Sequence, residues 1–539
     1  MKHFKFSCFF WLCLSGASIK LSAQQGGVSS SDSLTVVQIL PGVKKLEFRK
    51  IDSLTELQIL TGNVRLKQGR TFFSCDSCVI NKRFKTFEAF GRVHINDSDT
   101  AHIYSEYMRY LTDKRIAYFN RKVRLTDGEG TLTTEDLEYD VNTKIGIYKN
   151  GGKVVNKSTV LTSRDGYYYT DIKDVYFKNN VELKDLAYYI KTDSLLYNTQ
   201  TSTARFIAYT FIKDSSGRTI ETHEGFYDRK NGKSEFGQRP LIHDGKLFVT
   251  GNHIVSDDST GVVQIRGSGV FVDTTQGISI LANEIYVNRK TDAFLATRSP
   301  LMIVRQDQDS IYITADTLFS AHLTDLYRNK DSLLITDTIR GVKEIRTDDK
   351  DSTNRYFEAF RHVRVFSDSL QSVCDSLFYS FRDSTFRLYQ GPVVWANGSQ
   401  VTGDTILLFT KNKKPDRMQV FENSFLVNQL DPGIYNQIKS TRMDGYFIDG
   451  AIDSIRARGA AESIYYIQDD DSAYTGINQA QSDIIDIYIR NKKLQRVVLR
   501  SAVKGIMWPM SQKTSEEMRL PNFHWLENRR PKTKYELFE

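Results

Sequence analysis

Apolar and polar residues alternate over short stretches along most of the chain. Many of these stretches follow a Gly or an Asn, as at 62–66, 91–95 and 180–183. Alternation with a period of two is typical of strands with one buried face. Turn-forming segments such as 142–144 and 150–152 separate the stretches. The pattern therefore predicts a nearly all-β protein, with about three short antiparallel strands in each repeat.

A hexamer recurs along the chain: a small residue, an acidic residue, a spacer, an aliphatic residue, a spacer, and then Tyr or another apolar residue. Copies start at 75, 105, 134, 163, 192 and 222, at intervals of 29 or 30 residues, and further copies start at 282, 315, 374 and 403. The sixth position places tyrosines at 110, 139, 168, 197 and 227. Self-similarity at a fixed period predicts an elongated repeat structure in which neighbouring repeats stack.

The repeat defines the domain organisation. We assign a first β-array to residues 55–327 and a second to residues 356–508, with a charge-dense junction at 328–355 between them. Residues 24–54 are an N-terminal leader. The polar C-terminal tail at 509–539 lacks alternation, which predicts a poorly ordered segment.

The first residues have the pattern of a secretory signal peptide. Lys2, His3 and Lys5 precede a mostly apolar stretch at 6–19. That stretch is shorter than the roughly 20 residues that span a bilayer. We therefore predict a signal peptide at residues 1–23, cleaved after Ala23, and an exported protein. An uncleaved anchor is the alternative.

Composition narrows the class of protein further. A hydrophobic fraction of 40% with 12% aromatic residues excludes a disordered chain. A net charge of +8 spread over 539 residues does not predict a nucleic-acid partner. Once the signal peptide is removed, only Cys75, Cys78 and Cys374 remain, too few for a disulfide scaffold. Cys75 and Cys78 either fill ordinary repeat positions or form a local disulfide.

The sequence shows no catalytic motif. It has no GxSxG, no HExxH and no P-loop, and its histidines lack zinc-ligand spacing. The acidic residue of the hexamer recurs in most copies, whereas a catalytic pair would be singular. We expect that residue to have a local role at a strand start, where it accepts backbone N–H bonds. The predictions are no enzymatic activity, no catalytic residues, no metal and no cofactor.

The repeated layout resembles the OstA-like family, the lipopolysaccharide-transport A type of periplasmic β-jellyroll, and in its length a Bacteroidetes-type member. The resemblance rests on the segment 62–66, the hexamer that follows, and a strand at 86–90 that ends before Gly91. It implies V-shaped β-jellyroll arrays with an apolar groove, which shields the lipid A acyl chains of lipopolysaccharide during transport to the outer membrane. It also implies a protein of the periplasm, peripheral to membranes, that can associate with the outer membrane.

The alternation selects candidates for the lining of that groove. They are Val64, Leu66, Val93, Ile95, Leu137, Tyr139, Ile145, Ile147, Phe177, Val181, Leu183, Leu195 and Tyr197.

The resemblance implies partners among other lipopolysaccharide-transport proteins, joined by edge-strand addition. Open strands at 57–66 and 494–499 are the expected edges. Other functions stay open at this point. An outer-membrane β-barrel or assembly protein has the same alternation, and a carbohydrate-active β-helix or a ligand-free cell-envelope scaffold would also be rich in strands.

Overall fold

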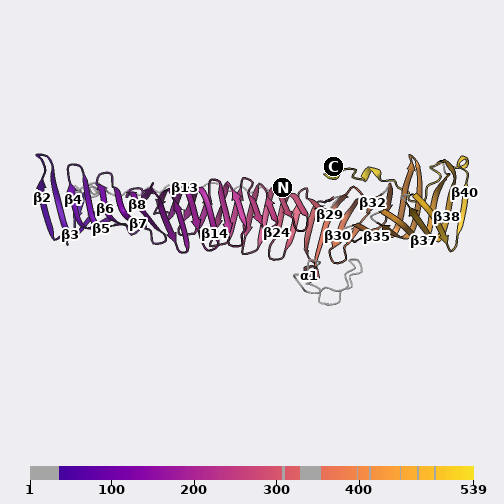
Figure 1. Cartoon of the computed structure of the whole chain (residues 1–539), viewed down its shortest axis with the longest axis horizontal. Coiled ribbons are helices and arrows are strands. Elements are labelled where there is room, and N and C mark those ends of the chain that lie inside the picture. The colour runs from indigo at the N-terminus through magenta and orange to yellow at the C-terminus, as the bar shows by residue number, and fades with distance from the viewer. Residues whose placement is uncertain are drawn as a thin grey trace, which may run out of the picture. The chain divides into compact units, whose positions relative to one another are not determined.

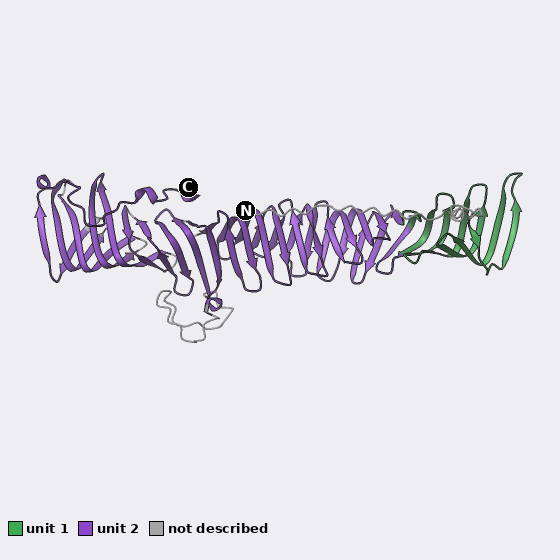
Figure 2. Cartoon of the chain, turned by 180° about the vertical axis from the view of Figure 1, so that it is seen from behind, with its two compact units in different colours: residues 1–125, 136–144 green, residues 126–135, 145–539 purple. Residues whose placement is uncertain are grey.

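The computed structural model describes residues 36–305, 310–327, 354–396, 398–411, 414–448, 451–469, 471, 473–490 and 493–538. Strands make up 69% of the structure and helices 3%, which confirms the all-β class. The predicted signal peptide at 1–23, residues 24–35 of the predicted leader and residues 328–353 of the predicted junction lie outside the described residues. The chain forms two compact units (Figure 2). Unit 1 comprises residues 1–125 and 136–144, and unit 2 comprises residues 126–135 and 145–539.

The strands follow one another in chain order (Figure 1). The first are β1 (Gln38–Ile39), β2 (Lys45–Lys50), β3 (Glu56–Gln68), β4 (Thr71–Asn81), β5 (Thr86–Asp97), β6 (Ala101–Leu111), β7 (Ile116–Thr126) and β8 (Thr131–Asp140). Next come β9 (Ile145–Tyr148), β10 (Gly152–Asn156), β11 (Thr159–Ser163), β12 (Asp165–Tyr169), β13 (Asp174–Lys184), β14 (Tyr188–Asn198), β15 (Thr203–Phe206), β16 (Thr210–Asp214), β17 (Thr219–Thr222) and β18 (Glu224–Asp228). They continue as β19 (Lys233–Gly237), β20 (Leu241–Asp244), β21 (Leu247–Thr250), β22 (His253–Asp257), β23 (Val262–Asp273), β24 (Ile278–Asn288), β25 (Ala293–Thr297), β26 (Leu301–Arg305), β27 (Ser310–Thr314) and β28 (Thr317–His322).

A short helix, α1 (Leu323–Tyr327), precedes the remaining strands. These are β29 (Arg355–Phe366), β30 (Gln371–Ser380), β31 (Thr385–Tyr389), β32 (Val393–Ala396), β33 (Ser399–Thr402), β34 (Thr405–Lys411), β35 (Lys414–Asp431), β36 (Ile434–Ile448), β37 (Ala451–Gln468), β38 (Tyr474–Arg490), β39 (Lys493–Arg500) and β40 (Lys504–Trp508). Three 3₁₀ turns follow: η2 (Met510–Gln512), η3 (Glu527–Arg529) and η4 (Lys534–Phe538).

The long strands are bent near their middle. At a bend two consecutive residues have positive φ, as at Gly91 and Arg92 (70° and 41°) in unit 1 and at Asn179 and Asn180 (62° and 55°) in unit 2. The register with the neighbouring strand shifts at the same point, as it does at a β-bulge. These Gly and Asn positions lie inside strands, not at strand starts as the sequence pattern suggested. A repeat with long strands therefore holds two bent strands rather than three short ones.

The bends divide the sheet of unit 2 into two walls. Residues 195–198 of β14 begin a first wall that continues through β15, β18, β19 and β22 to residues 262–266 of β23. Residues 188–192 of β14 begin a second wall that continues through β16, β17, β20 and β21 to residues 270–273 of β23. The bent strands β14 and β23 belong to both walls and join them. We call one bent strand across both walls a rung, and the gap between the walls' free ends, opposite the bends, the mouth.

The inner faces of the two walls form the core. Ile254 of the first wall and Val249 of the second belong to one apolar cluster. This cluster extends through the second array, where Val394, Ile455 and Ile485 are buried in it. Burial of these side chains from both walls holds the walls together.

The strands also bend at the hexamer, in a different way from the bends with two residues of positive φ. The first residue of the hexamer is small and buried, and its hydroxyl donates to the carbonyl two residues later, over 3.0 Å at Ser105 and 2.7 Å at Thr222. Its acidic residue accepts from the neighbouring strand's bend, so Asp76 Oδ1 lies 2.6 Å from Arg92 Nη2. Glu224 accepts from Gln238 in the same way over 3.0 Å. These carboxylates pair with side chains of the next strand rather than with the backbone N–H groups predicted.

The C-terminal tail is packed, so the prediction of poor order is wrong. Val394 points into the inner cluster, whereas its neighbours Val393 and Trp395 contact Leu526 of the tail on the outer face of the second wall. Further along, Met518 and Leu520 are buried against the same face. The tail doubles back from β40 toward β29 (Figure 1).

The ends of the strand series differ in part from the predicted edges. The predicted first edge, 57–66, lies in β3, which pairs with β2 along one half and with β1 along the other. The first strands are therefore β1 and β2. The predicted last edge lies in β39, which pairs with one half of β38, while β40 pairs with the other half. Strands β39 and β40 thus end the first and second walls.

Candidate lipid-binding groove

The predicted groove residues lie mostly in a filled interior. Eleven of the thirteen are no more than 5% exposed: Val64, Leu66, Val93, Ile95, Leu137, Tyr139, Phe177, Val181, Leu183, Leu195 and Tyr197. Ile145 and Ile147 are half-buried, because Gly146 and Tyr148 take the buried positions of β9. None of the thirteen lines the cavities described below. Their role in a lipid groove stays a prediction.

Large aromatic rings fill this interior. In unit 1, Phe73, Phe87 and Tyr110 pack with ring centroids 4.9 to 5.2 Å apart. In unit 2, Phe177 and Phe206 are fully buried. Rings of this size occupy the space between the walls, which leaves little room for a ligand.

Tyrosines of the hexamer also close the mouth. In unit 1, the Tyr110 hydroxyl at the end of β6 donates to Gln68 Oε1 at the end of β3 over 2.6 Å. The Tyr139 hydroxyl donates to Asp97 Oδ2 over 2.8 Å. In each pair the tyrosine and its acceptor end two bent strands on opposite sides of the bends, so that the bond crosses the gap between the free ends. We call these tyrosines the ladder.

Unit 2 has a ladder tyrosine of its own. The Tyr197 hydroxyl donates to Asn156 Oδ1 over 3.2 Å, and Asn156 Nδ2 donates to the carbonyl of Thr199 over 2.8 Å. Burial raises the pKa of Tyr197 above the ordinary tyrosine value, so the hydroxyl stays protonated and can donate. Arg229 Nη1 of the first wall and Asp185 Oδ2 of the second form an ion pair of 2.8 Å. The free ends of the two walls are thus joined across the mouth.

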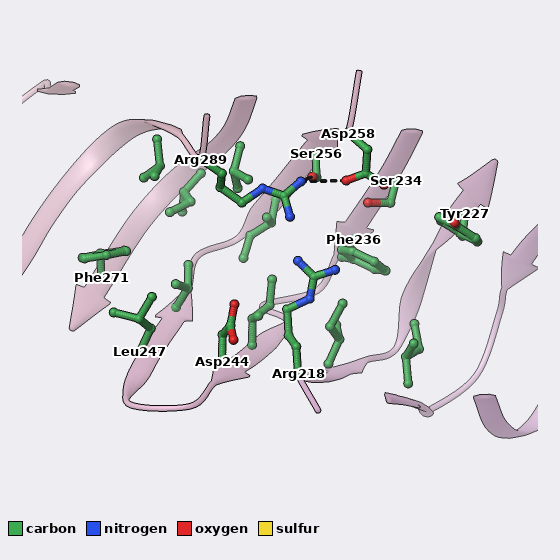
Figure 3. A pocket seen from close by; sticks show the side chains of 18 of the residues that line it. Arg218, Tyr227, Ser234, Phe236, Asp244, Leu247, Ser256, Asp258, Phe271 and Arg289 are labelled. Atoms are coloured by element: carbon green, nitrogen blue, oxygen red, sulfur yellow. Dashed lines mark hydrogen bonds and ion pairs between the residues drawn. The ribbon is translucent and has the colours of Figure 1, made fainter. Parts of the chain in front are cut away.

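The ladder ends at Tyr227, whose ring packs on Tyr188 at 4.6 Å. At the next two ladder positions the chain has Ser256 and Val287. A cavity of about 120 Å³ lies between the walls there (Figure 3). Its apolar lining comes from both walls: Ile190, Ile212, Ile220, Phe236, Ile242, Leu247, Val249, Ile254, Val263, Ile265, Phe271 and Val287.

Charged side chains surround the opening of this cavity. Arg289 Nη2 lies 2.6 Å from Asp258 Oδ1 and 3.2 Å from Ser256 Oγ on the first wall. Arg218 comes from the second wall, where its Nε lies 2.9 Å from Asp214 Oδ2. The two guanidinium groups point toward each other from opposite sides (Figure 3). The cavity is therefore apolar inside and charged at its rim, a distribution that suits an amphiphile with its head in water.

Two further cavities lie between the walls of unit 2. One of about 70 Å³ is lined by Ile311, Val365, Leu377 and Leu388 among others. The other, of about 470 Å³, is near the last strands and is lined by Leu426, Ile438, Ile455, Ile485 and Leu499 among others. Open space between the walls thus occurs repeatedly after Tyr188.

Among the described residues no cluster of three His, Cys, Asp or Glu residues could hold a metal ion. Cys75, Cys78 and Cys374 are buried free thiols, and burial raises the pKa of Cys374 to about 12. Within the same residues no helix has the length and apolar character needed to cross a membrane.

Comparison with known families matches the first part of the chain. Residues 39–193 fit the family described as OstA-like protein. This segment is OstA-like. The match confirms the resemblance found in the sequence, and it covers the closed rungs up to the middle of β14. The OstA-like type is that of a periplasmic lipid-transport β-jellyroll. No curated protein matches the chain.

The sequence analysis did not predict the residues that line the first cavity, because many of them lie in very short strands. Residues 203–257 form strands of four or five residues. In this part of the repeat the hexamer at 222 is a loose copy, and the position one period later has no recognisable copy. The alternation in β17, where Ile220 lies between Thr219 and Glu221, was the signal that could have identified this part of the lining.

Proposed function

We propose that this protein is a non-enzymatic lipid carrier of the periplasm, which shields acyl chains between the two walls of unit 2. The observation that supports this most directly is the apolar cavity lined by both walls, with charged residues at its rim. Each methylene that moves from water into such a cavity contributes about 0.8 kcal/mol. A carrier needs this apolar space and does not need a reactive group.

We further propose that the cargo is lipopolysaccharide, bound through the acyl chains of its lipid A, on the way to the outer membrane. The OstA-like segment supports this choice of lipid. A lipid with several acyl chains would use more than one of the three cavities. An apolar site of about 150 Å³ is enough to bind a molecule of the size of benzene. The cavity of about 470 Å³ exceeds this volume and has room for part of a chain, whereas the cavities of about 120 and 70 Å³ are smaller.

The purified mature chain tests this function. Lipopolysaccharide should bind saturably and displace a fluorescent fatty acid from the protein, whereas the delipidated core oligosaccharide should do neither. The oligosaccharide control separates recognition of acyl chains from recognition of sugar. No displacement by lipopolysaccharide at concentrations below its aggregation point would refute the proposed cargo.

We propose that the carrier joins other lipopolysaccharide-transport proteins through its terminal strands. At the start, Leu46 and Phe48 of β2 are 47% and 56% exposed, and at the end Ile506 and Met507 of β40 are 54% and 64% exposed. Strands with exposed apolar side chains at the end of a sheet favour addition of a further strand.

Proline substitution in β39 tests this assembly. Consecutive N–H groups of a strand point in opposite directions, so one of Val497 and Val498 directs its N–H away from β38. Val497→Pro and Val498→Pro should therefore differ: one should weaken the pairing with β38, and the other should block complex formation while the fold is kept. Pull-down of envelope partners together with circular dichroism distinguishes them. Normal complexes from both folded variants would exclude β39 as the docking strand.

A further inference from the structure

The sixth residue of the hexamer lies at the mouth. At 110, 139 and 197 it is Tyr, and the hydroxyl reaches an acceptor on the opposite free end. The hydroxyl of Tyr168, at the same position, is buried without such a bond, and Tyr227 lines the cavity. The acceptors Gln68, Asp97 and Asn156 lie 41 or 42 residues earlier in the chain. By the same offset Asp214 lies opposite Ser256. The serine side chain is too short to span the distance that a tyrosine spans.

The interruption coincides with open space. Ser256 and Val287 both line the cavity of about 120 Å³. The residues beside them point away: Val255 is absent from the lining, and the Tyr286 hydroxyl donates to Glu284 Oε1 over 2.6 Å. A tyrosine at 286 therefore does not replace the missing ladder tyrosine at 287, because adjacent residues of a strand face opposite sides.

We propose that the mouth over β20–β24 is a lateral port, through which the acyl chains of an amphiphile pass between the walls, and that the tyrosine ladder shuts the preceding rungs to this cargo. The proposal rests on the carrier function proposed above and adds the place where the cargo inserts. The port combines an apolar floor at Phe236 and Ile265 with a charged rim. An amphiphile can insert its chains there and keep its polar head at the surface.

Charges at the rim restrict what passes with the chains. Arg218 and Arg289 lie opposite each other, and Asp214, Asp244 and Asp258 lie beside them. Moving a charged head past this rim into the apolar floor would remove it from water without a dedicated partner, which is unfavourable. Only the acyl part of the cargo is therefore expected between the walls.

The first test maps the site in the wild-type chain. A palmitic acid analogue with a photoreactive diazirine near its methyl end is bound to the purified mature protein, and labelled peptides are identified by mass spectrometry. Labels should fall on segments of unit 2 after Tyr188, with β20–β24 among them, and not on residues 56–139. Labelling spread equally over residues 56–139 would overturn the proposal. Absence of any saturable labelling would instead refute the carrier function.

The second test closes the port. Ser256→Tyr combined with Val287→Tyr restores the ladder residue at two rungs and should weaken palmitate binding at least tenfold. Val255→Tyr adds the same ring to the outer face of the same strand and should leave binding within twofold of wild type. Circular dichroism and thermal unfolding establish that each variant is folded. Wild-type labelling of β20–β24 in a folded double variant would show that the mouth is not the port. If the double variant does not fold, the peptide map of the wild-type chain decides.

Discussion

Replacing Ile254 by Asp is expected to abolish acyl-chain binding between the walls of unit 2. Ile254 is 1% exposed and lies in both the inner cluster and the lining of the first cavity. An aspartate there would bring a carboxylate into the apolar floor without a partner, at a free-energy cost on the order of 4 kcal/mol. A water shell around the carboxylate would also occupy the space that an acyl chain needs. Displacement of a fluorescent fatty acid by lipopolysaccharide measures the loss.

Val255→Asp is the matched control for this change. Val255 is the next residue of β22, half-buried, and absent from the cavity lining. The same charge at this position faces the outer side and should leave lipid binding unchanged, with a loss of stability below about 1 kcal/mol. If Ile254→Asp is folded and still binds lipid like Val255→Asp, the space between the walls is not the binding site.

Deletion of the C-terminal tail after Gln512 should cause the largest loss of stability. The tail buries Met518, Leu520 and Leu537, and removal of each large apolar side chain from a core typically costs about 2–5 kcal/mol. It also covers the outer face of the second wall, where Phe425, Val427 and Tyr466 are buried against it. Exposure of that face creates an apolar patch that favours association. We expect a lower unfolding temperature, binding of a hydrophobic dye, and oligomers in gel filtration.

A single glutamine tests how the tail is held. Gln437 is 1% exposed; its Nε2 donates to the carbonyl of Met518 and its Oε1 accepts from the N–H of Leu520, both over 2.9 Å. Gln437→Ala removes both bonds and should cost about 1–3 kcal/mol. Gln419→Ala is the control, because Gln419 bonds to Asp444 and not to the tail. Protease cleavage within the tail should become faster in Gln437→Ala alone. Equal cleavage in the two variants would show that Gln437 does not anchor the tail.

Gln400 makes an equivalent pair of bonds to the tail, from Nε2 to the carbonyl of His524 and from the N–H of Leu526 to Oε1, both over 2.7 Å. Nothing in the sequence predicts this role. The glutamines and their partners lie more than 80 residues apart in the chain. Polar residues and prolines after Pro509 indicate poor order when they are considered alone. The tail is ordered because the outer face of the second wall is apolar and offers side-chain amides to its backbone.

The sequence by itself determined the class of strand-rich repeat, the period of 29 or 30 residues and the OstA-like character of residues 39–193. These follow from alternation and spacing, which are local properties of a chain. The tertiary structure decided what each hexamer position does. The acid pairs with a strand bend about 14 to 16 residues away, and the tyrosine with an acceptor 41 or 42 residues away. Such partners depend on where the strands bend and how they are stacked, so only the folded walls show which rungs are filled and which are open.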